Sequence, residues 1–157
     1  MDTNQSWKIV WFVTVIVMTG CATRSVQLPA TPVPPPYIAS PQSIWDGVFT
    51  EHQVVLGKTA YENACAECHM SDLSGHEMAS PLVGAFFAFR WRDKSIATLF
   101  ENLRTTMPQT APGSLGDQEY FDIIAFLLDK NGYPDGNQTL GSDVERLNFY
   151  KLERPNK

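Results

Sequence analysis

Several features that mark common protein classes are missing from this sequence of 157 residues. No apolar run reaches the about 20 residues that a membrane-spanning helix requires. Neither a glycine-rich phosphate-binding loop nor an internal repeat is present. The formal net charge of −5 leaves no excess of basic residues to neutralise phosphates, which argues against a nucleic acid as partner. The length allows one domain with appendages.

The first 20 residues are typical of an export signal. The uncharged apolar stretch at residues 9–19 is too short to span a membrane but suits the core of a signal peptide. The string "VMTGC" ends at Cys21 and resembles a bacterial lipoprotein processing site, where the cysteine is acylated. We therefore expect a signal peptide at residues 1–20, lipidation of Cys21 and a location on the periplasmic side of a bacterial membrane. Ordinary cleavage or an uncleaved N-terminal anchor are the alternatives.

Prolines dominate the segment that follows the signal. Six of them lie in residues 22–41, where the chain is polar and has too few apolar residues to form a core. We expect residues 21–42 to form a tether, with a recognition motif for a proline-binding domain as the alternative. The folded domain would then span residues 43–140. A C-terminal extension with a short helix would follow at residues 141–157.

Four segments show helical patterns, and no segment alternates apolar and polar residues as a strand would. We expect one helix after Thr50, where Gln53 would complete a capping box, and another after Ser95. The strongest pattern begins at about Asp117 and ends at an Asn-Gly pair, and a short fourth helix would start at Ser142. The fold class is therefore all-α, with three main helices and long loops. Three helices and long loops bury too little apolar surface for a stable core. We therefore expect an additional group to fill the interior of the domain.

The stretch "ACAECHM" holds two of the three cysteines and a histidine. On a helical turn the positions of Cys65, Cys68 and His69 share one face. Two thiols on that face can add to the two vinyl groups of a porphyrin while the adjacent imidazole reaches the iron, which is why C-x-x-C-H is typical of c-type haem attachment.

Three other interpretations of this motif are weaker. A redox dithiol of the thioredoxin type needs a βαβ context, which the sequence lacks. A zinc site needs four ligands, and neither a second C-x-x-C pair nor an H-x₃₋₅-H pair is present. A disulfide between Cys65 and Cys68 would close a very small loop and stabilise little.

An iron held by His69 would have a second axial position to fill. The candidate ligands are Met70, Met78, Met107, His52 and His76. Met70 and Met78 follow His69 so closely that they belong to the same side of the haem. Met107 is separated from His69 by a loop and a helix, and the proline after it stiffens the segment that would present its sulfur. We expect Met107 to be the ligand and the two other histidines to lie at the surface.

The complete pattern resembles the class I monohaem cytochrome c family. The resemblance spans residues 43 to about 140 and includes the blocks "ACAECHM", "PLVG", "FRW", "TTMP" and "YFDIIAFLLDKNGYPDG". This set of blocks is similar to the cytochrome subunits or domains of periplasmic quinoprotein dehydrogenases. It implies a cytochrome c fold in which three main helices and long loops surround one haem.

The resemblance also implies roles for individual residues. Cys65 and Cys68 would hold haem c covalently, and His69 and Met107 would be its axial ligands. The carbonyl of Pro81 would accept a hydrogen bond from His69 Nδ1–H.

Further roles concern the walls of the haem pocket. Trp91 would donate to a haem propionate, flanked by Arg90, Arg92 and Lys94, which either balance the propionate charge or form a solvated basic patch. The phenylalanines of "GAFFAF" would line the pocket; they are Phe86, Phe87 and Phe89. The first helix would cross the third near Tyr120 and Ile124, with Gly57 and Tyr61 at the contact. Met70 stands where the family mostly has glycine, which would crowd the haem edge.

These residues predict an electron-transfer protein and not an enzyme. Histidine and methionine together would saturate the iron, so that it could only change its oxidation state. The partners would be redox proteins, a dehydrogenase as donor and a cytochrome or oxidase as acceptor, with the membrane reached through the lipid anchor. A haem subunit of a periplasmic dehydrogenase complex is one alternative. A haem enzyme or sensor with an open axial site is another.

Overall fold

The computed structural model describes residues 43–154. The expected signal peptide, Cys21 and the tether lie outside the described residues. The described part contains one 3₁₀-helix and six α-helices and no strand, which confirms the all-α class. No helix in this part is long and apolar enough to cross a membrane. The elements are η1 (Ile44–Asp46), α1 (Glu51–Ala64), α2 (Ala66–His69), α3 (Gly84–Trp91), α4 (Ile96–Thr106), α5 (Asp117–Lys130) and α6 (Val144–Phe149).

The starts of α1 and α4 follow from local capping. Thr50 Oγ1 accepts a hydrogen bond from the backbone N–H of Gln53 at 3.2 Å, and Ser95 Oγ accepts one from Thr98 at 3.2 Å. The expected capping box at Thr50 is not closed. The buried side chain of Gln53 instead donates to Asp122 Oδ1 at 3.0 Å and exchanges two hydrogen bonds with the backbone of Leu140. Because the amide is engaged in these tertiary contacts, it does not close the capping box at the N-terminus of α1.

Two further expectations need correction. The N-cap of α6 is Asp143, whose Oδ1 accepts from the N–H of Arg146 at 3.2 Å, and not Ser142. A carboxylate is the better cap because it also interacts favourably with the helix dipole. The segment 84–91 forms α3, a helix that the sequence pattern did not indicate. Its N-cap is Val83, which makes no side-chain capping bond, and its apolar run lacks a clear period.

The crossing of α1 and α5 is the central contact of the domain. A Cβ atom at Gly57 would lie 1.8 Å from the carbonyl oxygen of Asp122, so only glycine permits this approach. One turn further on, the rings of Tyr61 and Phe126 lie 5.4 Å apart. The predicted crossing near Tyr120 and Ile124 is thus confirmed, with its closest point at Asp122.

The C-terminal segment packs into the same compact unit as the helices. Leu152 N–H donates to the carbonyl of Lys94 at 2.9 Å, and Ile96 N–H donates to Tyr150 at 3.0 Å. The side chains of Leu147, Tyr150 and Leu152 are buried in the common core. The segment that the sequence suggested as an extension therefore completes the packing around α4.

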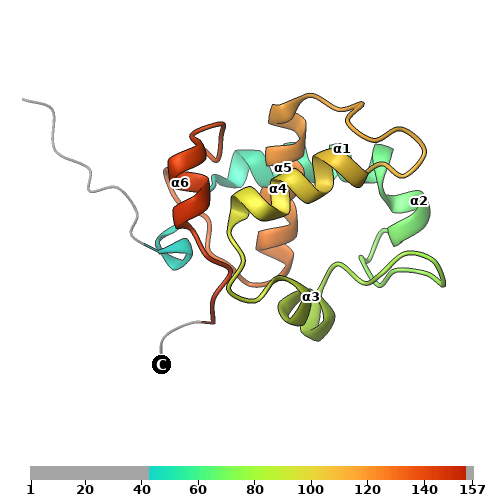
Figure 1. The fold of residues 1–157 in the computed structure, drawn as a ribbon, viewed down its shortest axis with the longest axis horizontal. Coiled ribbons are helices and arrows are strands. Elements are labelled where there is room, and N and C mark those ends of the chain that lie inside the picture. The colour runs from blue at the N-terminus through green and yellow to red at the C-terminus, as the bar shows by residue number, and fades with distance from the viewer. Residues whose placement is uncertain (1–42, 155–157) are drawn as a thin grey trace, which may run out of the picture. The chain divides into compact units, whose positions relative to one another are not determined.

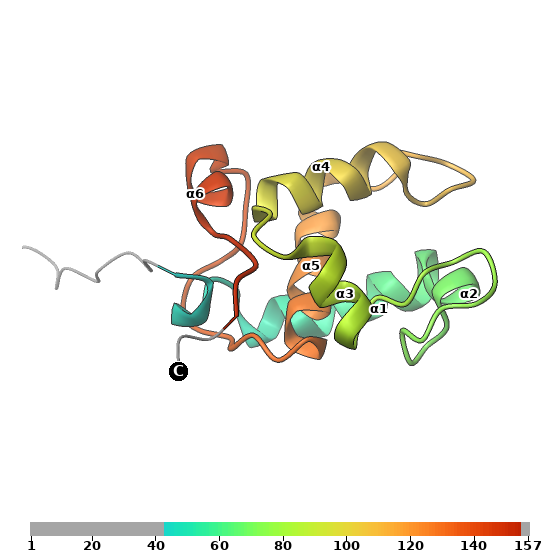
Figure 2. The same ribbon diagram turned by 60° about the horizontal axis from the view of Figure 1, so that its bottom comes forward.

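Different helices lie at the two ends of the described unit. Figures 1 and 2 show η1 and α6 at one end and α2 with its following loop at the other. Helix α5 crosses between α1 and α4, and α3 lies beside it in both views. The three main helices and α3 thus enclose the space next to α2.

Candidate cofactor site

A cavity of about 450 Å³ lies among α1, α2, α3, α4 and α5. Part of its wall consists of core side chains, among them Leu99, Ile123 and Leu127, each at most 2% exposed. Close-packed protein interiors contain few voids larger than a water molecule. A cavity of this size with buried apolar walls therefore has the character of a binding site for a large, mainly apolar group.

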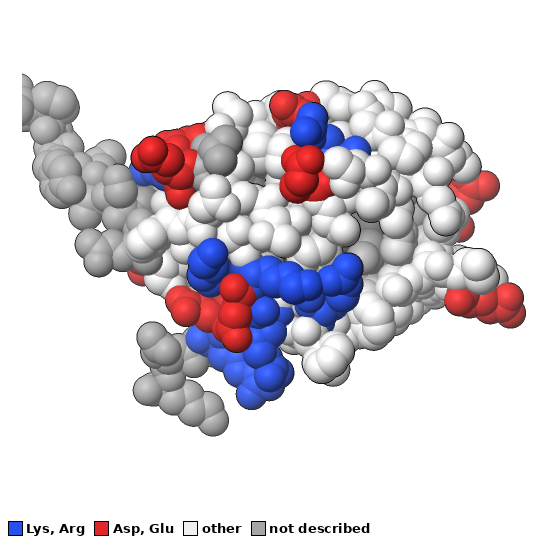
Figure 3. All heavy atoms as spheres, in the orientation of Figure 1, with Lys and Arg blue, Asp and Glu red and all other residues white. Residues whose placement is uncertain are grey.

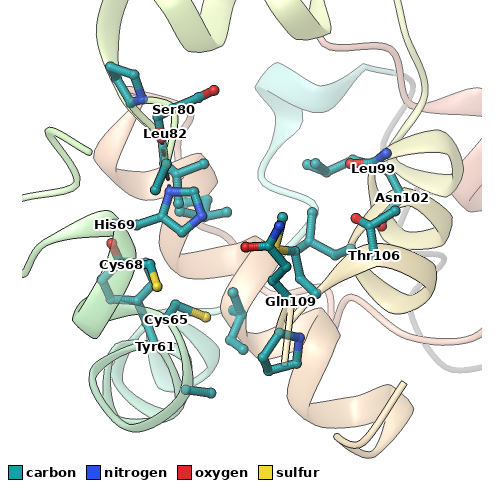
Figure 4. Close-up of a pocket in the computed structure, with 18 of the residues that line it drawn as sticks. Tyr61, Cys65, Cys68, His69, Ser80, Leu82, Leu99, Asn102, Thr106 and Gln109 are labelled. Carbon is teal, nitrogen blue, oxygen red and sulfur yellow. Dashed lines mark hydrogen bonds between the residues drawn. The ribbon is translucent and has the colours of Figure 1, made fainter. Parts of the chain in front are cut away.

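Cys65, Cys68 and His69 lie on one side of this cavity. Cys65 caps the C-terminus of α1, and the N–H groups of Cys68 and His69 donate back to its carbonyl at 3.1 and 2.9 Å. This single turn brings the three side chains to the cavity wall, as the sequence predicted (Figure 4). Neither sulfur forms a disulfide within the described residues. Burial, followed by the charges of Glu119 and Cys68, raises the pKa of the unattached Cys65 thiol to about 11.

The imidazole of His69 is oriented by the loop that follows α2. Its Nδ1 lies 2.9 Å from the carbonyl oxygen of Ser80. Because a carbonyl only accepts, Nδ1 carries the proton and Nε2 keeps its lone pair for a metal. The prediction that Pro81 supplies this carbonyl is corrected by one residue. Pro81 itself lines the cavity. Its ring has no N–H, so the loop bends without leaving a donor unpaired at this point.

Asn131 holds the same loop from the end of α5, a role that the sequence did not reveal. Its Nδ2 donates to the carbonyls of Leu82 at 3.0 Å and Leu127 at 2.7 Å, and its Oδ1 accepts from Gly84 N–H at 3.0 Å. The Asn-Gly pair indicated only a helix end, and Gly132 does have the left-handed φ of +84° that such an end favours. The amide of Asn131 thereby connects residues 82–84 to the end of α5.

Met107 lines the opposite side of the cavity. It is the C-cap residue of α4, and its carbonyl accepts a hydrogen bond from Tyr120 Oη at 2.7 Å. Figure 4 shows the neighbouring Thr106 and Gln109 across the cavity from His69. The two expected axial ligands, His69 and Met107, thus both line the cavity, and the chain around Met107 lies across it from His69.

A comparison with protein families identifies most of the residues around this cavity. Residues 52–127 match the family model described as cytochrome c oxidase, cbb3-type, subunit III.

Residues 52–127 form a class I c-type cytochrome domain.

The cofactor of such a domain is haem c, bound through the two cysteines of its motif, here Cys65 and Cys68. Among solved structures, this chain is similar to a chain of the sulfane dehydrogenase SoxCD from Paracoccus pantotrophus, with 20% identity and a TM-score of 0.44. The match covers 65% of this chain and 64% of that one. No curated protein sequence matches the chain.

The residues of the cytochrome domain fit haem c. Two thiols on one helical face, an imidazole whose Nδ1 meets a carbonyl and a thioether in the same cavity lining are the donor set that covalent, six-coordinate haem requires. The apolar walls match the porphyrin, and the polar edge of the cavity includes Arg90. His52 and His76 are exposed, as expected, and neither lines the cavity.

The aromatic residues of the cytochrome domain divide between cavity and surface. Phe86, Phe87 and Trp91 line the cavity. Phe89 is 80% exposed and does not, so the expectation that all three phenylalanines form the wall is wrong for this one. Donation from Trp91 to a propionate stays a prediction.

The remaining methionines differ in their position. Met78 is 93% exposed and reaches only the rim of the cavity. Met70 is not among the lining residues of the cavity, and its effect on the haem edge stays a prediction. Its backbone has φ of +63° and ψ of 154°, a region that is essentially restricted to glycine. The preference of the family for glycine at this position therefore has a backbone cause.

Proposed function

We propose that this chain is an electron carrier with one haem whose axial ligands are His69 and Met107. The observation that carries the proposal is that both residues line one cavity beside the C-x-x-C-H turn, with Thr106 and Gln109, which flank Met107 in the chain, across the cavity from His69. Haem c, when bound, supplies an iron that gains or loses one electron. A carrier with both axial positions filled by protein has no place for a substrate on the metal.

The side chains of the domain have distinct roles in this proposal. Cys65 and Cys68 attach the cofactor. His69 offers Nε2, while the Ser80 carbonyl keeps the proton on Nδ1 and so raises the basicity of the ligand. Met107 offers a thioether, which favours the reduced iron and raises the potential. The buried apolar walls exclude water, which keeps the surroundings of the iron nearly unchanged between its two oxidation states.

The absorption spectrum of the haem-loaded protein tests the axial assignment. The ferric form should show the weak sulfur-to-iron band, and Met107→Ala should abolish it and allow rapid carbon monoxide binding to the ferrous form. Met78→Ala is the matched control, because Met78 is a methionine at the rim and should leave the band unchanged. A band that survives in Met107→Ala, or that disappears in Met78→Ala, contradicts the proposed ligand.

A role within a larger redox assembly is a second proposal. The matched family is described as a subunit of an oxidase, which supports a partnership of this domain with a larger redox enzyme, either an oxidase or a dehydrogenase. Purification of the tagged full chain from its native membrane should then recover a stable stoichiometric partner with its own redox centre. Recovery of the chain alone under mild detergent conditions contradicts a permanent complex.

A lipid anchor at Cys21 would keep the domain at the periplasmic face of a membrane. The string "VMTGC" and the proline-rich segment after it support this proposal. Cys21→Ser should move the protein from the membrane fraction to the soluble fraction, and mass spectrometry of the native chain should find acyl groups on Cys21. An unmodified Cys21 in membrane-bound protein refutes lipidation.

A further inference from the structure

Basic side chains gather on one face of this acidic protein. Figure 3 shows the lysines and arginines concentrated over α3 and the C-terminal segment. We define the basic patch as the five residues Arg90, Arg92, Lys94, Lys151 and Arg154. Two backbone hydrogen bonds hold its two segments together, from Asp93 N–H to Leu152 at 3.2 Å and from Leu152 N–H to Lys94 at 2.9 Å. The patch therefore exists only in the folded chain.

The cations of the patch differ from the other cations of the domain in their ion pairing. Outside the patch, every lysine or arginine of residues 43–154 lies within 4 Å of a carboxylate: Lys58 with Glu62, Arg104 with Glu101, Lys130 with Asp129 and Arg146 with Asp143. No residue of the patch forms an ion pair within the described part of the chain, although Asp93 and Glu153 belong to the same two segments. The positive charge of the patch is thus available to an external partner.

The basic patch adjoins the cofactor cavity. Arg90 and Trp91 both line that cavity, and the guanidinium of Arg90 and the ammonium of Lys94 lie 5.0 and 5.3 Å from the Trp91 ring. Phe89, 80% exposed, precedes them on α3. An exposed aromatic residue beside a ring of charges is a common composition for a protein docking site.

We propose that the basic patch, with Phe89 beside it, docks an acidic redox protein that exchanges electrons with the haem through the Arg90–Trp91 wall. This inference rests on the proposed electron-carrier function. Charge complementarity selects an anionic partner, because the patch is positive while acidic residues predominate elsewhere on the domain. Because Arg90 of the patch also lines the cavity, next to Trp91, a partner on the patch lies close to the haem. This position favours a redox protein over a lipid surface, which has no redox centre.

The same charge distribution steers the partner. Outside the patch the domain has more acidic than basic residues, which should repel an anionic protein, whereas the patch attracts it. Small redox interfaces bind weakly, so orientation during the encounter decides the rate more than affinity does. The association rate should therefore depend strongly on ionic strength.

Two double variants of the full haem-loaded chain test the patch. Arg92→Gln/Lys151→Gln removes two exposed charges of the patch, and neither residue lines the cavity. Lys58→Gln/Lys130→Gln removes the same total charge from faces where both cations are already paired. The probe is one-electron oxidation of the ferrous protein by the hexacyanoferrate(III) anion, followed by stopped-flow absorption, with the tris(phenanthroline)cobalt(III) cation as the opposite charge.

At about 10 mM ionic strength, where the screening length is about 30 Å, the patch variant should react with hexacyanoferrate about tenfold more slowly than the native protein. The control variant should change less than about twofold, the cobalt complex should show the reverse order, and high salt should remove the difference. Equal rates in the two double variants overturn the patch as the entry point. The electron-carrier function survives that result if native and control proteins still oxidise reversibly.

A competition experiment decides the class of the partner. Poly-L-glutamate, an acidic polypeptide, should slow the hexacyanoferrate reaction of the native and control proteins and have little effect on the patch variant. Co-sedimentation with phosphatidylglycerol vesicles should be the same for both double variants. Vesicle binding that the patch variant alone loses overturns a protein partner in favour of an anionic lipid surface.

Discussion

The two chain segments that face each other across the cavity are held in very different ways. The proximal strap, residues 70–83, follows His69 and is anchored by Tyr61 at its start, by its own internal hydrogen bonds and by Asn131 at its end. The distal strap, residues 107–116, carries Met107, and its residues 109–114 are exposed. In the described chain, one side-chain hydrogen bond joins the distal strap to another element, from Tyr120 to the carbonyl of Met107.

This difference indicates how the two proposed axial ligands are expected to behave. His69 lies on a helical turn whose position the covalent thioethers and a well-anchored strap both determine. Met107 depends on the end of α4 and on one tyrosine. The methionine should therefore be the ligand that leaves first under heat, alkali or competing ligands, because regions with few buried contacts open at lower free energy.

The largest change expected from breaking the proximal anchoring comes from Asn131→Ala. It removes three hydrogen bonds at once, and the unfolding free energy should fall by roughly 2 kcal/mol. Denaturant titration of the haem-loaded protein measures this value. Asn137→Ala is the control, because Asn137 is exposed, and it should change stability by less than about 0.5 kcal/mol. Equal losses in both variants would refute the anchoring role.

Removing the distal anchor should have a smaller effect on stability and a specific effect on the ligand. Tyr120→Phe leaves the Met107 carbonyl without its donor, at a cost of about 1 kcal/mol. Imidazole should then displace the methionine at about fivefold lower concentration, followed through the loss of the sulfur-to-iron band.

Tyr61→Phe provides the matched comparison, since Tyr61 makes the equivalent bond to the Met70 carbonyl on the proximal side at 2.7 Å. It should cost a similar stability and leave the imidazole titration unchanged. If the two phenylalanine variants shift the titration alike, the asymmetry between the straps is not a property of these anchors.

The smallest expected effect is a gain. Met70 holds a positive φ that strains a side-chain-bearing residue, so Met70→Gly should raise the unfolding free energy by about 1 kcal/mol despite the greater freedom of glycine in the unfolded chain. Leu73 also has a positive φ, of +61°, but its side chain is 3% exposed. Leu73→Gly should therefore destabilise the protein through lost burial, and a loss in Met70→Gly would show that the backbone there is not strained.

Local sequence was sufficient wherever the interaction was local. The caps at Thr50 and Ser95 act over three residues, and the C-x-x-C-H turn places its three side chains within one helical turn, so both could be predicted without knowledge of the fold. The prediction that Met107 is the second ligand rests on its separation from His69 by a loop and a helix, and Met107 does line the cavity. Pro81 and Trp91 also line it, but the carbonyl that meets His69 belongs to Ser80 and not to Pro81.

The tertiary structure decided every feature in which residues distant in sequence must meet. The side chain of Gln53 does not cap α1 because it forms buried hydrogen bonds with Asp122 and Leu140. Asn131 forms a hydrogen bond with a loop residue nearly 50 positions earlier in the chain. The basic patch exists because the C-terminal segment pairs with the residues between α3 and α4. Local patterns specify helices and a haem attachment turn through short-range sterics and hydrogen bonds. Which carbonyl faces the imidazole, and which charges remain unpaired, depends on long-range packing that no short window of sequence contains.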